Sequence, residues 1–246
     1  MISERDRQIV DFINKGRDLE STSQCSHLKE IVSIGSAFFP YRENYRVYNR
    51  RLELYHSNHK NSSNNTIIRR RFQRKIIRDM SNTILSARVL YDIYSNEDYD
   101  NQFLCFMKEL RNFISHHSHI NLISRIHLEK GKKDVYEKIP KTEIEDYLNE
   151  MIEKNPKWQG LKSAKEFLSS QNEIRLNELI DRYDEEVMNL YKDILFSTVR
   201  KYTDALKSFI EESQELQQQA REINFELEYP VIGAKLRYVN YLISKI

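Results

Sequence analysis

The chain contains few of the residues that shape tight turns, cross-links and membrane spans. Of its 246 residues, 5 are glycine and 4 are proline, too few for a protein with many tight turns, so we expect a mainly helical fold. Its two cysteines, Cys25 and Cys105, are too few for a disulfide framework and lack metal-ligand spacing. No stretch approaches the roughly 18 consecutive apolar residues of a membrane span, and the N-terminus has no apolar signal core. We therefore expect a cytoplasmic protein.

Charge is distributed unevenly along the chain, although the formal net charge is only +2. Between Arg42 and Arg78 there are eleven basic residues and two acidic ones, with aromatic residues interleaved, whereas from Glu143 to Glu228 there are twenty acidic and eleven basic residues. A basic segment with interleaved aromatic residues can bind a polyanion. A helix face exposed to solvent has the same composition, so both interpretations stay open on this feature alone.

Apolar residues at helical spacing predict most of the secondary structure. Alternating apolar residues over 120–139, around a Lys130-Gly131-Lys132 turn, predict a single β-hairpin. Residues 173–222 contain neither glycine nor proline, which predicts a long helix that is bent or packs on a partner as a coiled-coil-like arm. The other expected helices cover about 9–16, 27–55 (with Pro40 as a candidate break), 66–94, 97–116, 142–151 and 158–168, and a polar loop covers 57–65.

The segment Arg111-Asn112-Phe113-Ile114-Ser115-His116 is the strongest functional signal in the sequence. At about 100° per residue, Asn112 and His116 share a helix face nearly opposite the apolar stripe, and Arg111 lies on the flank between them. A guanidinium, a carboxamide and an imidazole within two helical turns can hold a phosphodiester and move a proton to or from it. The apolar stripe consists of Tyr99, Phe103, Phe106, Met107, Leu110, Phe113 and Ile114.

The neighbouring histidines are better explained in other ways. His117 falls on the apolar stripe, where a buried, hydrogen-bonded histidine is favoured over a catalytic one. His116, His117 and His119 have no nearby carboxylate or cysteine that would complete a zinc site. We therefore expect neither a metal nor a cofactor.

The motif and the residues after it resemble the HEPN superfamily, whose signature is an arginine, a polar residue that is often asparagine, and a histidine a few residues later. The similarity covers about Thr66 to Leu168, since the hairpin, the next helix, Trp158 and the Ala164 to Leu168 segment look like parts of uncharacterised bacterial HEPN-like proteins. It implies a HEPN-like helical bundle over residues 66–246, with residues 1–65 as an N-terminal helical extension. In one HEPN branch a modified tyrosine follows the histidine by two residues; Ser118 stands there, so regulation by nucleotide addition is not supported.

The resemblance implies a metal-independent endoribonuclease, a toxin or antiviral-defence effector that cleaves RNA by 2′-OH attack. Arg111 would hold the phosphate, Asn112 would orient the imidazole or bind phosphate, and His116 would act as general acid or base. A homodimer would place two motifs side by side, because one histidine cannot be acid and base at once. A neutralising or sensor protein would be a further partner. The expected RNA-binding residues are Arg69, Arg70, Arg71, Arg74, Lys75 and Arg78.

A non-catalytic helical dimer, which uses a HEPN-like fold for binding, is the alternative hypothesis. In that protein Arg111 and His116 would be polar residues of an interface. A DNA-binding regulator ranks third, because no helix-turn-helix spacing stands out. A basic surface near the motif would favour the nuclease over the scaffold.

Overall fold

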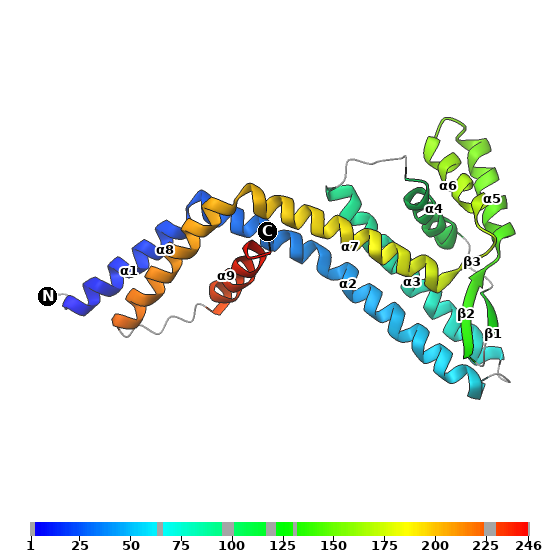
Figure 1. Cartoon of the computed structure of the whole chain (residues 1–246), viewed down its shortest axis with the longest axis horizontal. Coiled ribbons are helices and arrows are strands. Elements are labelled where there is room, and N and C mark those ends of the chain that lie inside the picture. Colours follow the sequence, from blue (N-terminus) through cyan, green and yellow to red (C-terminus); the bar gives the residue numbers. More distant parts are fainter. Residues whose placement is uncertain are drawn as a thin grey trace. The chain divides into compact units, whose positions relative to one another are not determined.

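The computed structural model describes residues 3–62, 66–94, 101–116, 122–129, 132–223 and 230–245. These residues are mainly helical, with a small three-stranded antiparallel sheet (Figure 1), which confirms the mainly α class. Within them, no helix has the length and apolar character needed to cross a membrane.

The elements follow one another along the chain as α1 (Glu4–Glu20), α2 (Ser23–Ser62), α3 (Thr66–Tyr94), α4 (Gln102–His116), β1 (Ile123–Glu129), β2 (Lys132–Ile139), α5 (Lys141–Lys154), α6 (Gln159–Ser170), β3 (Ile174–Arg175), α7 (Leu176–Lys201), α8 (Thr203–Glu222) and α9 (Pro230–Ile243).

Close contacts divide the chain into two compact units. Unit 1 comprises Met1–Ala37 and Leu190–Ile246, and unit 2 comprises Phe38–Asn189. The boundaries between the units fall inside α2 and α7, whereas the sequence had placed a domain boundary near residue 65. The motif helix, the hairpin and the basic part of α3 all belong to unit 2.

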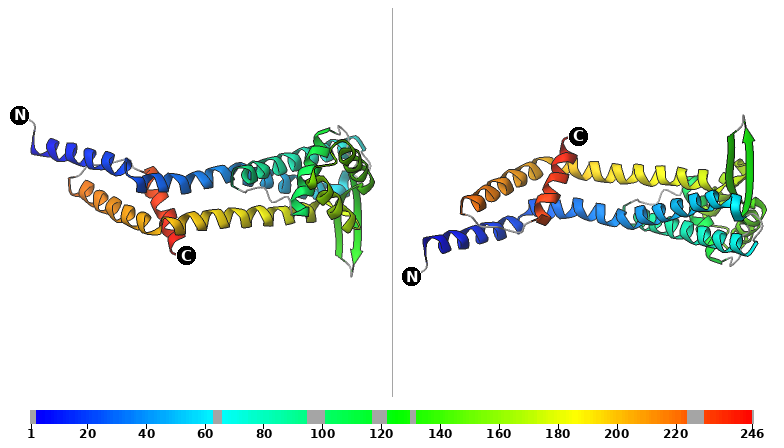
Figure 2. Two further views of the ribbon diagram at one scale, coloured as in Figure 1. Left: turned by 90° about the horizontal axis from the view of Figure 1, so that it is seen from above. Right: turned by 90° about the horizontal axis from the view of Figure 1, so that it is seen from below.

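In unit 1, α1 and α8 lie side by side (Figure 2). The hydroxyl of Ser3 accepts a hydrogen bond from the backbone N–H of Asp6, and the backbone N–H of Ser3 donates one to the carboxylate of Asp6, which forms a capping box at the start of α1. The helix was expected to end near Gly16 but continues to Glu20. Leu216 packs near Gly16, so the packing of α8 against α1 outweighs the weak helix propensity of one glycine.

The predicted long helix over 173–222 is interrupted at Tyr202, between α7 and α8. The ring of Tyr202 stacks on the imidazole of His27 with centroids 3.7 Å apart, and its N–H is shared between the carbonyls of Thr198 and Val199. A tertiary contact therefore coincides with the break, and neither glycine nor proline marks it in the sequence.

Helix α2 continues through Pro40, the candidate break, and extends to Ser62. The neighbouring Tyr41 is fully buried and its hydroxyl donates a hydrogen bond of 2.9 Å to Asp184 of α7. Such contacts compensate for the backbone hydrogen bond that proline removes. The predicted polar loop over 57–65 is therefore helical as far as Ser62, and residues 63–65 lie outside the described residues.

The predicted β-hairpin is confirmed in β1 and β2, which pair antiparallel from Ile123 with Lys138 to Glu129 with Lys132. The third strand, β3, was not predicted; Ile174 pairs with Ile139, and Arg175 pairs with Lys138. A two-residue strand has no periodicity of its own, so only its partner β2 defines it.

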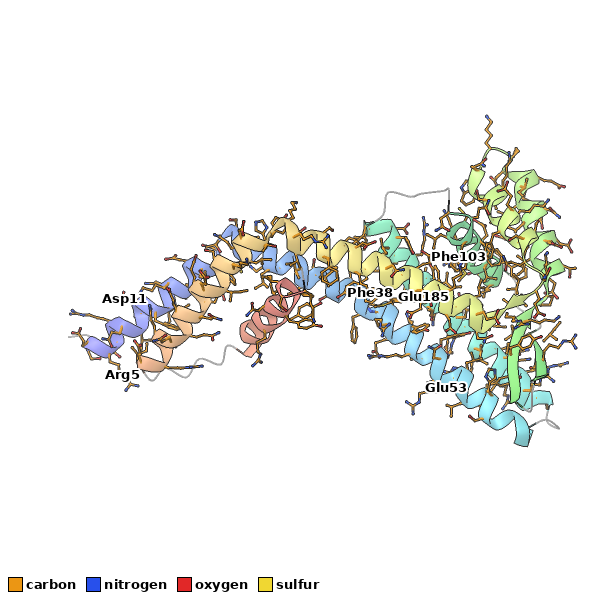
Figure 3. All side chains as sticks on the ribbon, viewed as in Figure 1. Arg5, Asp11, Phe38, Glu53, Phe103 and Glu185 are labelled. Carbon is orange, nitrogen blue, oxygen red and sulfur yellow. The ribbon has the colours of Figure 1, made fainter. Side chains whose placement is uncertain are left out.

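The core of unit 2 contains the apolar stripe of α4. Phe103 and Phe106 pack against Phe167 of α6, with ring centroids 5.4 and 4.9 Å apart; Figure 3 labels Phe103 on α4. Phe113 packs against Tyr147 of α5. The predicted stripe is thus confirmed from Phe103 to Ile114, while Tyr99 lies outside the described residues. The buried members are Phe103, Phe106, Met107, Leu110, Phe113 and Ile114.

Candidate functional site

The three motif residues lie on the last two turns of α4. Arg111 and Asn112 are half-buried, whereas His116, the last residue of the helix, is exposed. These exposures agree with the helix phase inferred from the sequence. His117, Ser118 and His119 lie outside the described residues, so the prediction that His117 is buried is not tested.

A chain of side-chain hydrogen bonds connects Arg111 and Asn112 to the interior. Nη1 of Arg111 donates to Oδ1 of Asn112 over 3.2 Å, and Nδ2 of Asn112 donates to Oε2 of Glu109 over 3.4 Å. The hydroxyl of Tyr147, on α5, donates to the same oxygen over 3.5 Å. The guanidinium is therefore held by a relay that ends on a neighbouring helix.

Glu109 anchors this relay, and the sequence analysis missed it. Its side chain is 1% exposed, and this burial raises the pKa of the Glu109 carboxyl, against the hydrogen bond from Asn112, which lowers it. Its position three residues before Asn112 places both on one face of the helix. This spacing was visible in the sequence, but the burial of the carboxyl group was not.

Arg111 has a donor that the relay does not use. Its Nε atom is buried and has no hydrogen-bond partner among the described residues. A buried donor without an acceptor costs about 1–3 kcal/mol, and an oxyanion of a ligand would be a suitable acceptor. The helix end therefore combines a guanidinium that is fixed by Asn112 with an exposed imidazole.

The basic residues of α3 divide into two groups. Arg70, Arg71, Arg74 and Lys75 are exposed. Arg69 is half-buried and its Nη2 donates to the hydroxyl of Ser124 in β1 over 3.3 Å. Arg78 is exposed, and its Nη2 lies 3.4 Å from the carboxylate of Asp79. The first group is exposed on the surface of α3, where a polyanion can reach it.

A second buried carboxyl group lies where the hairpin meets α2 and α3, and we call its surroundings the Glu137 centre: Glu137, Ser124, Tyr55, Arg69 and Gln73. Ser124 donates to Oε2 of Glu137 over 2.9 Å, and the Tyr55 hydroxyl lies 3.0 Å from the Ser124 hydroxyl. Either hydroxyl can be the donor in the second bond.

Gln73 adds a direct link from α3 to the start of the hairpin, because its Nε2 donates to the carbonyl of Leu122 over 3.0 Å. Glu137 is 1% exposed and its Oε1 has no hydrogen-bond partner among the described residues. Burial raises the pKa of the Glu137 carboxyl to about 7, although the Ser124 hydrogen bond and the Arg69 charge lower it. The hairpin is thus attached through a carboxyl group that titrates near neutral pH.

In the part of the chain that the structure describes, no group of three or more His, Cys, Asp or Glu side chains is arranged to hold a metal ion. Cys25 and Cys105 are both buried and free. Comparison of the chain with protein-family models, with curated proteins and with solved structures gave no match.

Proposed function

We propose that the chain is a metal-independent endoribonuclease of HEPN type, a toxin or antiviral-defence effector that acts as a homodimer. The observation that carries this proposal is the end of α4, where Arg111 is fixed by Asn112 and the exposed imidazole of His116 follows. Arginine provides a planar fork of donors for two phosphate oxygens. Histidine titrates near neutral pH and can serve as acid or base.

The reaction uses the nucleophile that RNA itself carries. The imidazole of His116 in one protomer removes the 2′-OH proton, and the 2′ oxygen attacks the adjacent phosphorus. The bond from phosphorus to the 5′ oxygen breaks, and the protonated His116 of the second protomer donates its proton to that oxygen. The products are a 2′,3′-cyclic phosphate and a free 5′-OH end, and Arg111 offsets the charge that develops on the phosphoryl oxygens.

The exposed basic residues of α3 support the choice of a nucleic acid as substrate. Arg70, Arg71, Arg74 and Lys75 offer four cations on the helix that packs against the motif helix. Contacts of this kind bind the phosphate backbone without sequence preference. A basic surface of this kind is expected of a nuclease and is not needed by a scaffold.

The direct test is cleavage of mixed RNA by the purified chain in the presence of EDTA. Wild-type protein should cleave, and His116→Ala should lose about 10² to 10⁴ in rate, as expected for removal of a general acid or base. Ser115→Ala, at the exposed neighbouring position, is the matched control and should keep the wild-type rate. Equal rates for the wild-type protein and His116→Ala would refute the proposal.

A non-catalytic dimeric scaffold is the second candidate. It is favoured by the relay itself, since the hydrogen bonds of Arg111 and Asn112 run within the protein to Glu109 and Tyr147. In that case the arginine only stabilises the helix end. The same assay separates the two functions, because a dimeric wild-type protein that leaves RNA intact is a scaffold.

A further inference from the structure

Helix α3 has an exposed apolar stripe at its C-terminal end that neither the core nor RNA binding explains. Leu85, Val89 and Ile93 are 43%, 49% and 59% exposed. Steps of four residues place them on one face of the helix. We call these three residues the α3 stripe.

The α3 stripe points away from the core of unit 2. The buried residues of α3 form the opposite face of the helix, so the fold of one chain leaves the stripe uncovered. A contiguous exposed apolar patch marks a site of association more often than a chance feature of a soluble surface. The buried face consists of Ile76, Asp79, Met80, Thr83, Ile84, Ala87 and Leu90.

The charges beside the stripe are self-complementary. Arg88 and Asp92 flank Val89 and form an ion pair of 2.8 Å within the helix. If two copies of α3 pack antiparallel about a two-fold axis at Val89, Leu85 of each copy comes level with Ile93 of the other. Arg88 of each copy then lies about 3 Å along the helix axis from Asp92 of the other, at a rise of about 1.5 Å per residue. Two reciprocal ion pairs would therefore lie along one flank of the apolar contact, with the two Arg88 residues between the two Asp92 residues.

The basic residues do not oppose this arrangement. Arg78 is eleven residues from Val89, or about 16 Å along the helix, so the two basic segments extend in opposite directions from the axis. The Arg78 residues of the two copies are then separated by about 33 Å along the helix axis, well beyond the Debye length of about 10 Å at 0.1 M salt. A single partner that bound the whole outer face of α3 would need acidic residues opposite the basic segment and apolar residues opposite the α3 stripe.

We propose that the α3 stripe is the homodimer interface of this protein, formed by two antiparallel α3 helices about a two-fold axis near Val89. This inference rests on the proposed function, because the composite site is incomplete without a second imidazole. Only seven residues separate the end of α3 at Tyr94 from the start of α4 at Gln102, and the two helices pack together. Pairing at this end of α3 therefore keeps the start of each motif helix, which is about 22 Å long, within seven residues of a paired helix end.

The experiment measures the mass of the full-length chain by light scattering over a concentration series. Wild-type protein should be a dimer, and Val89→Lys and Val89→Glu should each be monomeric, because each places two like charges at the axis. An equimolar mixture of the two variants should restore a dimer that contains one copy of each, which excludes misfolding as the cause. Ile67→Lys is the matched control: Ile67 is 66% exposed on the same face, about 33 Å from Val89, and this variant should stay dimeric.

The outcomes separate the inference from the proposed function when RNA cleavage is assayed in parallel. A Val89→Lys variant that stays dimeric, or a mixture that does not re-associate, overturns the α3 interface and leaves the nuclease intact. Monomeric wild-type protein at every concentration overturns the inference, and cleavage by that monomer also refutes the composite site. If the wild-type protein is a dimer and its Val89 variants are monomers, but the wild-type protein leaves RNA intact, the interface is supported and the nuclease is refuted.

Discussion

At the scale of single residues, Glu109 determines how the motif is presented. Its carboxylate accepts hydrogen bonds from Asn112 and from Tyr147, so one buried acceptor satisfies donors from two helices. A side chain that acts through another residue is a positioning residue, and its removal affects the fold as well as the site. The sequence showed the spacing of Glu109 and Asn112, but the burial of the carboxyl group depends on α5, which is distant along the chain.

Replacement of Glu109 should therefore reduce stability in proportion to the acceptors that are lost. Glu109→Ala leaves the donors of Asn112 and Tyr147 unpaired and should lower the free energy of unfolding by about 1–3 kcal/mol, while Glu109→Gln, which keeps one acceptor oxygen, should lose less. Urea unfolding followed by the fluorescence of Trp158, the single tryptophan of the chain, measures both. Glu166→Ala, which removes an exposed acceptor from Gln102, is the control and should change stability by less than about 0.5 kcal/mol. Equal effects of Glu109→Ala and Glu166→Ala would contradict the relay.

At the scale of elements, local sequence signals and tertiary contacts determined different parts of the structure. The stripe of α4 and the hairpin were predicted because each repeats a pattern over many residues. The break at Tyr202 and the strand β3 were not, because each depends on a distant partner, His27 and Ile139 respectively. The Glu137 centre belongs to this second class, since three elements that are separated in sequence bury one carboxyl group.

The Glu137 centre should make the stability of the protein depend on pH. The pKa of the Glu137 carboxyl is about 7 in the folded protein, above its usual value of 4.5, so folding takes up a proton between these two values. Stability therefore falls as the pH rises from about 4.5 to about 7, by about 3 kcal/mol in total. Glu137→Gln should remove this loss, so the difference in unfolding free energy between variant and wild-type protein should grow over the same pH window and stay constant above it.

Glu173→Gln is the control for this pH dependence. The hydrogen bond from Arg175 lowers the pKa of the Glu173 carboxyl, so its contribution is present above the usual pKa and is lost only as the pH falls below it. The variant should keep the wild-type slope between pH 5 and 7. A slope that persists in Glu137→Gln would show that another group causes it.

The basic residues of α3 should contribute to RNA binding through charge alone. The triple variant Arg70→Glu, Arg71→Glu and Arg74→Glu should weaken binding about equally for all RNA sequences. It should also reduce the slope of log affinity against log salt by about 2, since each phosphate contact to a single strand contributes about 0.7. Filter binding at several salt concentrations measures both quantities. Binding that is insensitive to salt, or unchanged in the triple variant, would assign these arginines to a solvated helix face.

At the scale of the whole molecule, the features that carry the proposed function are concentrated in unit 2. The motif helix, the exposed arginines, the Glu137 centre and the α3 stripe all fall within Phe38–Asn189. Unit 1 is formed from both ends of the chain, and none of the predicted functional residues falls within it. A composite nuclease site needs more than one copy of unit 2, which makes the oligomeric state part of the chemistry.

The measurement that tests the central claim most directly is cleavage, in EDTA, of an RNA and of the same RNA with a single 2′-deoxy substitution at the cut site. We expect the wild-type protein to cut the first with 2′,3′-cyclic phosphate ends and to leave the second intact, because the 2′-OH is the nucleophile. Arg111→Ala and His116→Ala should each lose about 10² to 10⁴ in rate on the first RNA. Cleavage of the substituted RNA at the same bond, or undiminished cleavage by either variant, would contradict the assignment of Arg111 and His116 as the catalytic site.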